Sequence, residues 1–218
     1  MEIYLGEGAF LTMILSAIEV YHRECLGLLY GHSCQGRVLV DAAFPHQTAR
    51  RAHRMIYLNI PRLKRIHEAI MKMGRFQFLG LYHSHPQSHR IQPVPSLSRI
   101  DSESMVEGLV EVIIAVNERR RTQAWQYRSN GELSGSFAGL RFHLAAYTLR
   151  GGNQERVPII CPFALGFMEE NKAATVNRSM RVLTSLVLDA LSPPESPRQS
   201  IPRRKASLFP RKKGLIPC

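Results

Sequence analysis

The sequence has few cysteines and no long apolar run, and both shortages limit the classes of protein it can belong to. Its four cysteines, at positions 25, 34, 161 and 218, lie far apart and form no C-x-x-C pair. Neither a disulfide framework nor a cysteine-based zinc site is therefore expected. The absence of any run of 18 apolar residues leaves no candidate for a transmembrane helix. The first residues, 1–7, are acidic and do not resemble a signal peptide, so we expect a cytoplasmic protein.

Acidic residues are also scarce, with 17 Asp and Glu against 29 Lys and Arg and a net charge of +12. Residues 193–218 carry half of that charge, because they hold seven Lys or Arg residues and one acid. The same segment contains six prolines and cannot bury a core, so we expect a basic, Pro-rich disordered tail. Such a tail is either a solubilising terminus or an electrostatic contact for an acidic partner, an anionic membrane or nucleic acid.

Hydrophobic periodicity predicts an α+β fold, in which helices flank a mixed β-sheet. Apolar residues recur at intervals of three and four in the predicted helices, and Met71 and Met73 are expected to fill the core beneath the second of them. The predicted strands are short apolar runs, of which 122–127 should pair with 110–116 and Pro158 should confine 156–160 to an edge. The predicted helices are 8–23, 61–74, 98–108 and 163–191, and the predicted strands are 26–31, 37–44, 55–58, 75–82, 110–116, 122–127, 140–147 and 156–160.

These elements divide the chain into three predicted parts. Residues 1–160 form the main domain, 161–192 a C-terminal helical extension, and 193–218 the basic tail. The 163–191 helix carries an apolar stripe that packs either on the sheet or on a second subunit, so an oligomer through this helix is one expectation.

One predicted strand ends in a pair of histidines. Side chains alternate along a strand, so His83 and His85 point to the same face, and Pro86 then removes a backbone donor from the ladder. Neutral imidazole is the commonest metal ligand in proteins. Two imidazoles on one face supply two of the three protein ligands that a catalytic zinc site uses.

Carboxylates downstream of the histidine pair can supply the third ligand. Asp101 is preferred over Glu103 because Ser98 and Asp101 are three residues apart and so share one face of a predicted helix. Ser98 is also a plausible N-cap for that helix. A hydrolytic site needs a base that is not a ligand, and Glu24 is the candidate because it lies where a helix meets an apolar strand.

Together these residues resemble the JAMM motif of the MPN-plus (Mov34/PAD-one/JAB) zinc metallopeptidases. The resemblance covers about residues 3–150, and it implies an MPN/JAB-like fold with layering like that of cytidine deaminases. It further implies one Zn²⁺ per chain and a substrate that is a ubiquitin-like protein or its conjugate, cut at an isopeptide or peptide bond. The residues that carry it are Glu24-x-x-Gly27-Leu28-Leu29-x-Gly31, His83-Ser84-His85-Pro86 and Ser98-x-x-Asp101.

The resemblance also assigns a role to each site residue. It implies that His83, His85 and Asp101 bind zinc. It implies that Glu24 moves a proton from the attacking water to the leaving amine, and that Ser98 helps to hold the oxyanion.

The sequence departs from the family pattern between the second histidine and the serine. The family usually has seven residues there, whereas residues 86–97 make twelve, and they include His89 as a further candidate ligand. Insertions in loops cost little stability, so metal binding should survive while substrate fit at that rim changes. The longer loop keeps a non-catalytic MPN scaffold as an alternative. A nucleic-acid-associated protein is a second alternative, although relatives linked to DNA repair have Asn between the histidines, where this chain has Ser84.

Overall fold

The structure is a computed structural model that describes residues 1–46, 50–51, 56–57, 59–88, 91–118 and 121–167. All of these belong to the first of two units into which the chain divides, Met1–Glu170. The predicted tail (193–218), nearly all of the predicted 163–191 helix and His89 lie outside the described residues.

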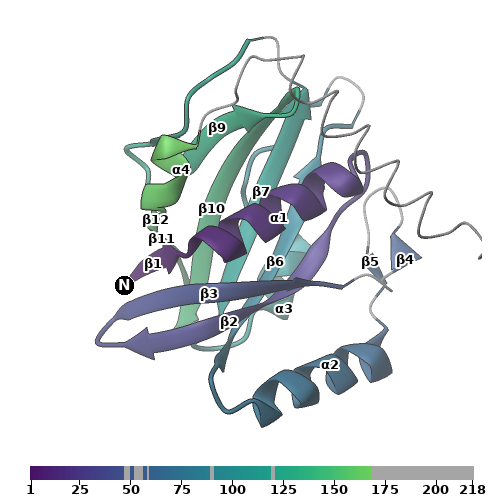
Figure 1. The fold of residues 1–218 in the computed structure, drawn as a ribbon, viewed down its shortest axis with the longest axis vertical. Coiled ribbons are helices and arrows are strands. Elements are labelled where there is room, and N and C mark those ends of the chain that lie inside the picture. The colour runs from purple at the N-terminus through teal and green to yellow at the C-terminus, as the bar shows by residue number, and fades with distance from the viewer. Residues whose placement is uncertain (47–49, 52–55, 58, 89–90, 119–120, 168–218) are drawn as a thin grey trace, which may run out of the picture. The chain divides into compact units, whose positions relative to one another are not determined.

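A mixed β-sheet dominates the described part, as the predicted α+β class requires (Figure 1). The strand order is β12-β1-β3-β2-β6-β7-β10-β9-β8, with β11 paired to β10 and a separate β4-β5 pair. The strands are β1 (Glu2–Leu5), β2 (Leu26–Cys34), β3 (Arg37–Pro45), β4 (Arg50–Arg51), β5 (Ile56–Tyr57), β6 (Gln77–Pro86), β7 (Val110–Glu118), β8 (Gln126–Tyr127), β9 (Leu133–Phe137), β10 (Leu140–Arg150), β11 (Asn153–Val157) and β12 (Ile159–Ile160). The helices are α1 (Glu7–Glu19), α2 (Ile60–Lys72), α3 (Arg99–Ser104) and α4 (Pro162–Gly166). None of the helices in the described residues is long and apolar enough to cross a membrane.

Helix α1 packs across one face of the sheet and forms the main core with it (Figure 1). Its apolar positions bury Phe10, Met13 and Ile14 completely. The ring of Phe10 meets Trp125 edge-on, with ring centroids 4.9 Å apart. This arrangement is a favourable geometry for an aromatic pair.

A bulge in β6 decides which face its histidines occupy. Leu29 pairs with Gly80 but Tyr30 pairs with Phe78, so one extra residue stands in β6. Gly80 has φ +144°, and a Cβ there would lie 1.9 Å from the carbonyl oxygen of Val110, so only glycine fits. The extra residue shifts the alternation of the strand. The side chains of Leu81, His83 and His85 are thereby turned away from α1, whereas Tyr82 joins the α1 core.

The face turned away from α1 carries two smaller clusters. In one, α2 packs through Ile70 on Leu28 and Tyr30 of β2, and the Tyr30 hydroxyl lies 2.9 Å from Nδ1 of His67. Burial raises the pKa of Tyr30 to about 12. In the other, the buried residues of β7 and β10 pack against the loop and turn on either side of α3; they are Ile113, Ala145 and Tyr147, with Leu97 and Met105.

The structure differs from the predictions in the pairing of one strand, in the presence of another, and in the exposure of two methionines. The strand at 126–127 pairs with β9 rather than with β7, because β10 occupies that side of β7. The prediction missed β9 altogether, since Leu-Ser-Gly-Ser-Phe is too polar and small to read as a strand. Met71 and Met73 are exposed, 41% and 63%, because α2 buries only Ile70 fully.

Two predicted helices end earlier than expected. Helix α1 ends at Glu19 instead of at 23, and α3 ends at Ser104 instead of near 108, because Met105 adopts an extended backbone. Of the helix predicted over 163–191, the described residues show α4, which ends at Gly166 before an extended Phe167. At the other edge, Pro158 separates β11 from β12, and β12 is an edge strand as predicted.

Candidate metal centre

The C-terminal end of β6 brings the two predicted histidines together. Nε2 of His83 lies 3.0 Å from Nε2 of His85, with both rings on the face turned away from α1. The strand is held between β2 and β7, and Ser84 strengthens this end because its hydroxyl accepts a hydrogen bond of 2.8 Å from the Cys25 amide. The positions of the imidazoles are therefore set by the sheet itself.

Helix α3 brings Asp101 to the same point. Its first turn is a capping box, in which the Ser98 hydroxyl accepts from the Asp101 amide (3.2 Å) and the Asp101 carboxylate accepts from the Ser98 amide (2.7 Å). This box orients the Asp101 carboxylate toward the histidines. Its Oδ1 lies 3.4 Å from Nε2 of His83, and its Oδ2 lies 3.6 Å from Nε2 of His85.

These three residues form a group that could hold a metal ion. One ligand atom from each of His83, His85 and Asp101 lies within 4.8 Å of the others.

The Asp101 carboxylate also interacts electrostatically with the two imidazoles. Burial alone would lower the pKa of His83, but its hydrogen bonds to Asp101 and Glu111 raise the pKa to about 9. Burial would raise the pKa of Asp101, but hydrogen bonds from His83 and His85 hold it well below its usual range.

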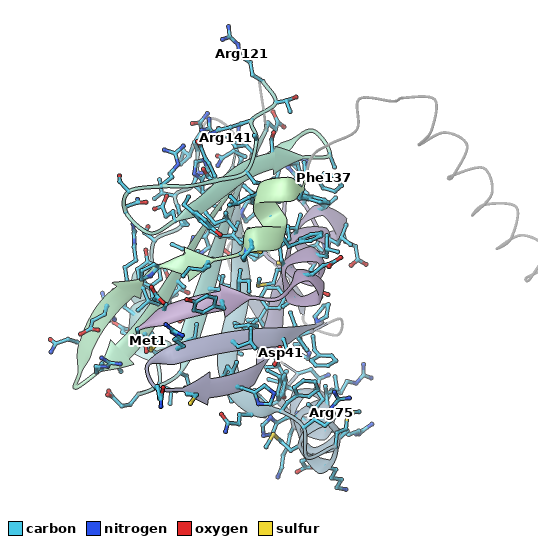
Figure 2. The ribbon with its side chains drawn as sticks, turned by 60° about the vertical axis from the view of Figure 1, so that its left-hand side comes forward. Met1, Asp41, Arg75, Arg121, Phe137 and Arg141 are labelled. Atoms are coloured by element: carbon cyan, nitrogen blue, oxygen red, sulfur yellow. The ribbon has the colours of Figure 1, made fainter. Side chains whose placement is uncertain are left out.

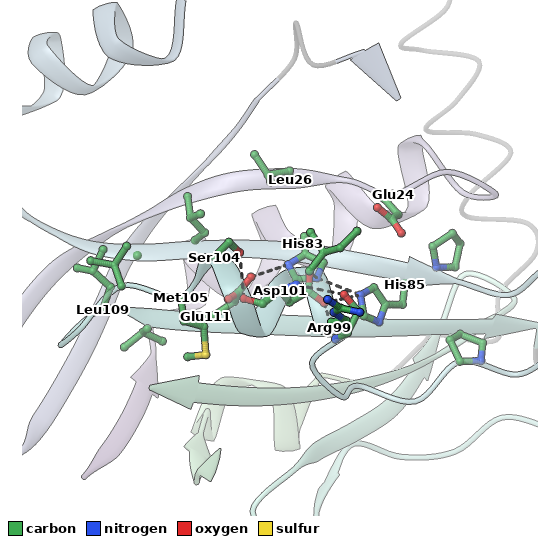
Figure 3. A pocket seen from close by; sticks show the side chains of 18 of the residues that line it. Glu24, Leu26, His83, His85, Arg99, Asp101, Ser104, Met105, Leu109 and Glu111 are labelled. Atoms are coloured by element: carbon green, nitrogen blue, oxygen red, sulfur yellow. Dashed lines mark hydrogen bonds and ion pairs between the residues drawn. The ribbon is translucent and has the colours of Figure 1, made fainter. Parts of the chain in front are cut away.

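Glu111 is a site residue that the sequence interpretation missed. Its Oε1 lies 3.2 Å from Nδ1 of His83, on the side of the ring away from Asp101 (Figure 3). Glu111 is the one acid in the run Val110–Val116 of a strand that is otherwise apolar. A lone charge in a buried strand is costly unless it has a partner, and this was the signal that could have identified it.

Comparison with known proteins decides the family. The model of the family described as prokaryotic homologs of the JAB domain matches residues 7–128. The chain belongs to this family. The matched segment contains Glu24, both histidines, Ser98 and Asp101.

Solved structures agree on the fold. The solution structure of protein DSY2949 from Desulfitobacterium hafniense superposes with a TM-score of 0.53 and 17% sequence identity, covering 73% of this chain and 92% of that chain. At that identity the likeness shows the fold alone. No curated protein matches the chain.

A pocket of about 940 Å³ opens over the metal centre of this JAB-domain chain. Glu24 lines it together with the three candidate ligands, and its carboxylate points toward the side where His85 lies (Figure 3). Glu24 is half-buried, two residues before β2 begins, between the first helix and an apolar strand as the sequence predicted for a base. Apolar side chains also line this pocket, among them Leu26, Leu81, Met105, Val106 and Leu109.

Ser98 lines the same pocket but is committed to the cap of α3. Its hydroxyl oxygen accepts the Asp101 amide, which leaves the hydroxyl proton available for donation. The two predicted roles of Ser98, capping and oxyanion binding, use different parts of one hydroxyl group.

The lengthened loop between His85 and Ser98 is tied to the sheet at several points. The side-chain amide of Asn117 donates to the Pro93 carbonyl (3.4 Å), and the Tyr147 hydroxyl donates to the Pro95 carbonyl (2.8 Å). Tyr147 in turn accepts a 2.7 Å hydrogen bond from Arg156. Although the loop has five extra residues, the Asp101 carboxylate oxygens still lie 3.4 Å from Nε2 of His83 and 3.6 Å from Nε2 of His85.

Proposed function

We propose that this protein is a zinc-dependent hydrolase that cleaves isopeptide or peptide bonds at the C-terminus of a ubiquitin-like protein, acting in the cytoplasm. The observation that carries the proposal is the convergence of His83, His85 and Asp101 within 4.8 Å, in a pocket that Glu24 also lines. Two imidazoles and one carboxylate are a donor set that catalytic zinc uses, with one position left for water. The residues present therefore fit a zinc ion.

When bound, zinc polarises a carbonyl group and lowers the pKa of water to roughly 7. The chain's own residues supply the proton transfers. Glu24 accepts the proton of the attacking water and then donates it to the leaving amine. The Ser98 hydroxyl donates a hydrogen bond to the oxyanion of the tetrahedral intermediate. No covalent enzyme intermediate is needed.

The lining of the pocket supports an extended peptide as the substrate. Its apolar residues suit the side chains of such a peptide. Glu24 lines the same pocket, where the leaving amine that it must protonate would lie. A flexible C-terminal tail of a ubiquitin-like protein meets both requirements, because it can enter the pocket in an extended form.

The test uses zinc-loaded protein and a linear fusion of a ubiquitin-like protein to a short reporter. We expect cleavage at the fusion junction by the wild-type chain. We expect Glu24→Gln to retain its zinc and to lose activity by about 10²- to 10⁴-fold, the usual contribution of general acid–base catalysis. Glu19→Gln, an exposed carboxylate at the end of α1, is the matched control and should keep full activity.

The result distinguishes the hydrolase from a non-catalytic scaffold. Full activity in Glu24→Gln would refute the assigned mechanism. Zinc binding without cleavage of any ubiquitin-like fusion would favour the scaffold. A protein that binds no zinc would exclude the hydrolase.

A further inference from the structure

We propose that Glu111 is a positioning residue, which fixes the ring and the tautomer of His83 so that Nε2 faces the metal. This inference rests on the proposed zinc site but concerns a residue outside the ligand set. The acid comes from β7, the strand next to the one that carries the histidines.

The two nitrogens of His83 face different groups. Nε2 points into the centre, 3.0 Å from Nε2 of His85 and 3.4 Å from Asp101, whereas Nδ1 faces Glu111 at 3.2 Å. A neutral imidazole carries one N–H, and an ionised carboxylate only accepts hydrogen bonds. When a metal ion replaces the proton on Nε2, Glu111 would therefore keep the remaining proton on Nδ1 and leave the lone pair of Nε2 for the ion. Carboxylates bonded to metal-binding histidines act in this way.

The sheet keeps Glu111 in place beside the ring. In the parallel pairing of β6 with β7, Leu81 is opposite Glu111 and His83 is opposite Ile113, so the acid is the diagonal neighbour of the histidine on one face. The His83 side chain is 7% exposed and that of Glu111 is 12% exposed. Bulk water therefore has little access with which to replace this hydrogen bond.

A purely structural role does not account for an acid at this position. The side chains of Val110 and Val112 on either side of it are buried in the core. A buried ion pair is often no more stabilising than well-packed apolar residues of similar size, so the strand alone gives no reason for a carboxylate. Orientation of a metal ligand does give one.

The experiment measures zinc affinity in the full-length chain by competition with a chromophoric chelator. We expect Glu111→Ala to bind zinc about 10- to 100-fold more weakly, the usual effect of removing such a partner. Glu111→Gln should lose less affinity than Glu111→Ala, because its amide oxygen still accepts from Nδ1. Glu118→Gln, an exposed acid at the end of the same strand, is the matched control and should bind like the wild type.

A second readout reports the tautomer directly. In ¹⁵N spectra of the zinc-loaded wild type, His83 should bind through Nε2 and carry its proton on Nδ1. This measurement decides the question even where Glu111→Ala fails to fold. Coordination through Nδ1 would overturn the proposal, as would zinc affinity in Glu111→Ala within twofold of the wild type.

The two proposals fail in different ways. A wild-type chain that binds no zinc overturns both the hydrolase and the role of Glu111. Normal zinc binding and cleavage by Glu111→Ala overturns the role of Glu111 alone.

Discussion

The candidate metal centre is built from two regions that are held in opposite ways. His83 and His85 end a strand in the middle of the sheet, which is backed by the main core; His83 pairs with both β2 and β7, and His85 pairs with β7. Asp101 belongs to a six-residue helix that buries none of its residues. The strand side is fixed by apolar packing, whereas the helix side depends on the capping box, on the loop contacts and on a paired hydrogen bond between Ser102 and Gln154. The helix side should therefore be the more easily disturbed.

Replacing a ligand on either side should have the largest effect, and the two sides should differ in stability. Both His83→Ala and Asp101→Ala should weaken zinc binding by more than about 100-fold, since even outer partners cost up to that much. His83→Ala should also lower the free energy of unfolding of the metal-free protein by about 3 kcal/mol, because it leaves Glu111 buried without its partner. Asp101→Ala should cost about 1 kcal/mol, the value of a cap.

Chelator competition and urea unfolding of both metal-free variants check this prediction. Equal losses of stability would show that the strand and the helix are equally supported. The helix side would then not be more easily disturbed than the strand side.

Removing the Tyr147 hydroxyl should disturb the helix side alone. Tyr147→Phe keeps the ring on Ile113 and Ala145 but removes the hydrogen bonds to Pro95 and Arg156. We expect a loss of about 1–3 kcal/mol in stability, because the Pro95 carbonyl loses its donor. Zinc affinity should also fall, because the loop that leads to Asp101 loosens.

Hydrogen exchange provides the measurement for this variant. Amide exchange should accelerate over residues 91–104 and stay unchanged in β6. Faster exchange in β6 as well would contradict the division into two regions. Tyr127→Phe, which removes a hydroxyl bonded to the Cys161 amide at another place, is the control.

The sequence was enough to predict the histidine pair and the cap of α3, but it did not predict features that depend on contacts between strands. His83 and His85 follow an apolar run, and Ser98 and Asp101 have the spacing of a cap, so both could be recognised from neighbouring residues. The bulge at Gly80 could not, because it depends on which residues of β2 stand opposite. It reverses the faces of β6 before the histidines, which alternation alone does not reveal.

Strand β9 and the role of Glu111 were not predicted for the same physical reason. Strand β9 exists because Gly135 leaves room for the Trp125 ring, which a Cβ would approach to 2.3 Å, and β10 provides its partner. The role of Glu111 depends on the register of β6 against β7. The lone acid in an apolar run marks Glu111 in the sequence, but its partner, like strand β9, is set by residues distant in the sequence, which local propensity does not reveal.

Two replacements of Ser98 should separate its cap from its proposed catalytic contact. Ser98→Ala should lower stability by about 1 kcal/mol, whereas Ser98→Gly should cost only a few tenths, because glycine is tolerated at an N-cap. Both remove the hydroxyl and should lower kcat with zinc content unchanged. Thermal unfolding and steady-state cleavage measure the two effects, and a glycine variant with wild-type kcat would limit Ser98 to capping.

The smallest expected effect is a pH dependence at His143 on β10, away from the metal centre. Burial, together with the nearby charges of Arg141 and Arg128, lowers the pKa of His143 to about 4. The ordinary value is 6.5, so the unfolded chain binds the proton more readily. This contribution to stability is complete above about pH 6.5 and is lost as the pH falls toward 4.

His143→Gln should remove that slope. Urea unfolding of the wild type and the variant between pH 4 and 7 gives the difference at each pH. We expect the two curves to converge as the pH falls. A constant difference across this range would contradict the lowered pKa.

The most direct test of the central claim is a crystal of the zinc-loaded protein with anomalous scattering measured at the zinc edge. We expect one peak per chain, coordinated by Nε2 of His83, Nε2 of His85 and the Asp101 carboxylate, with Glu111 still bonded to Nδ1 of His83. A peak at any other group of residues, or zinc bound without Asp101, would contradict it.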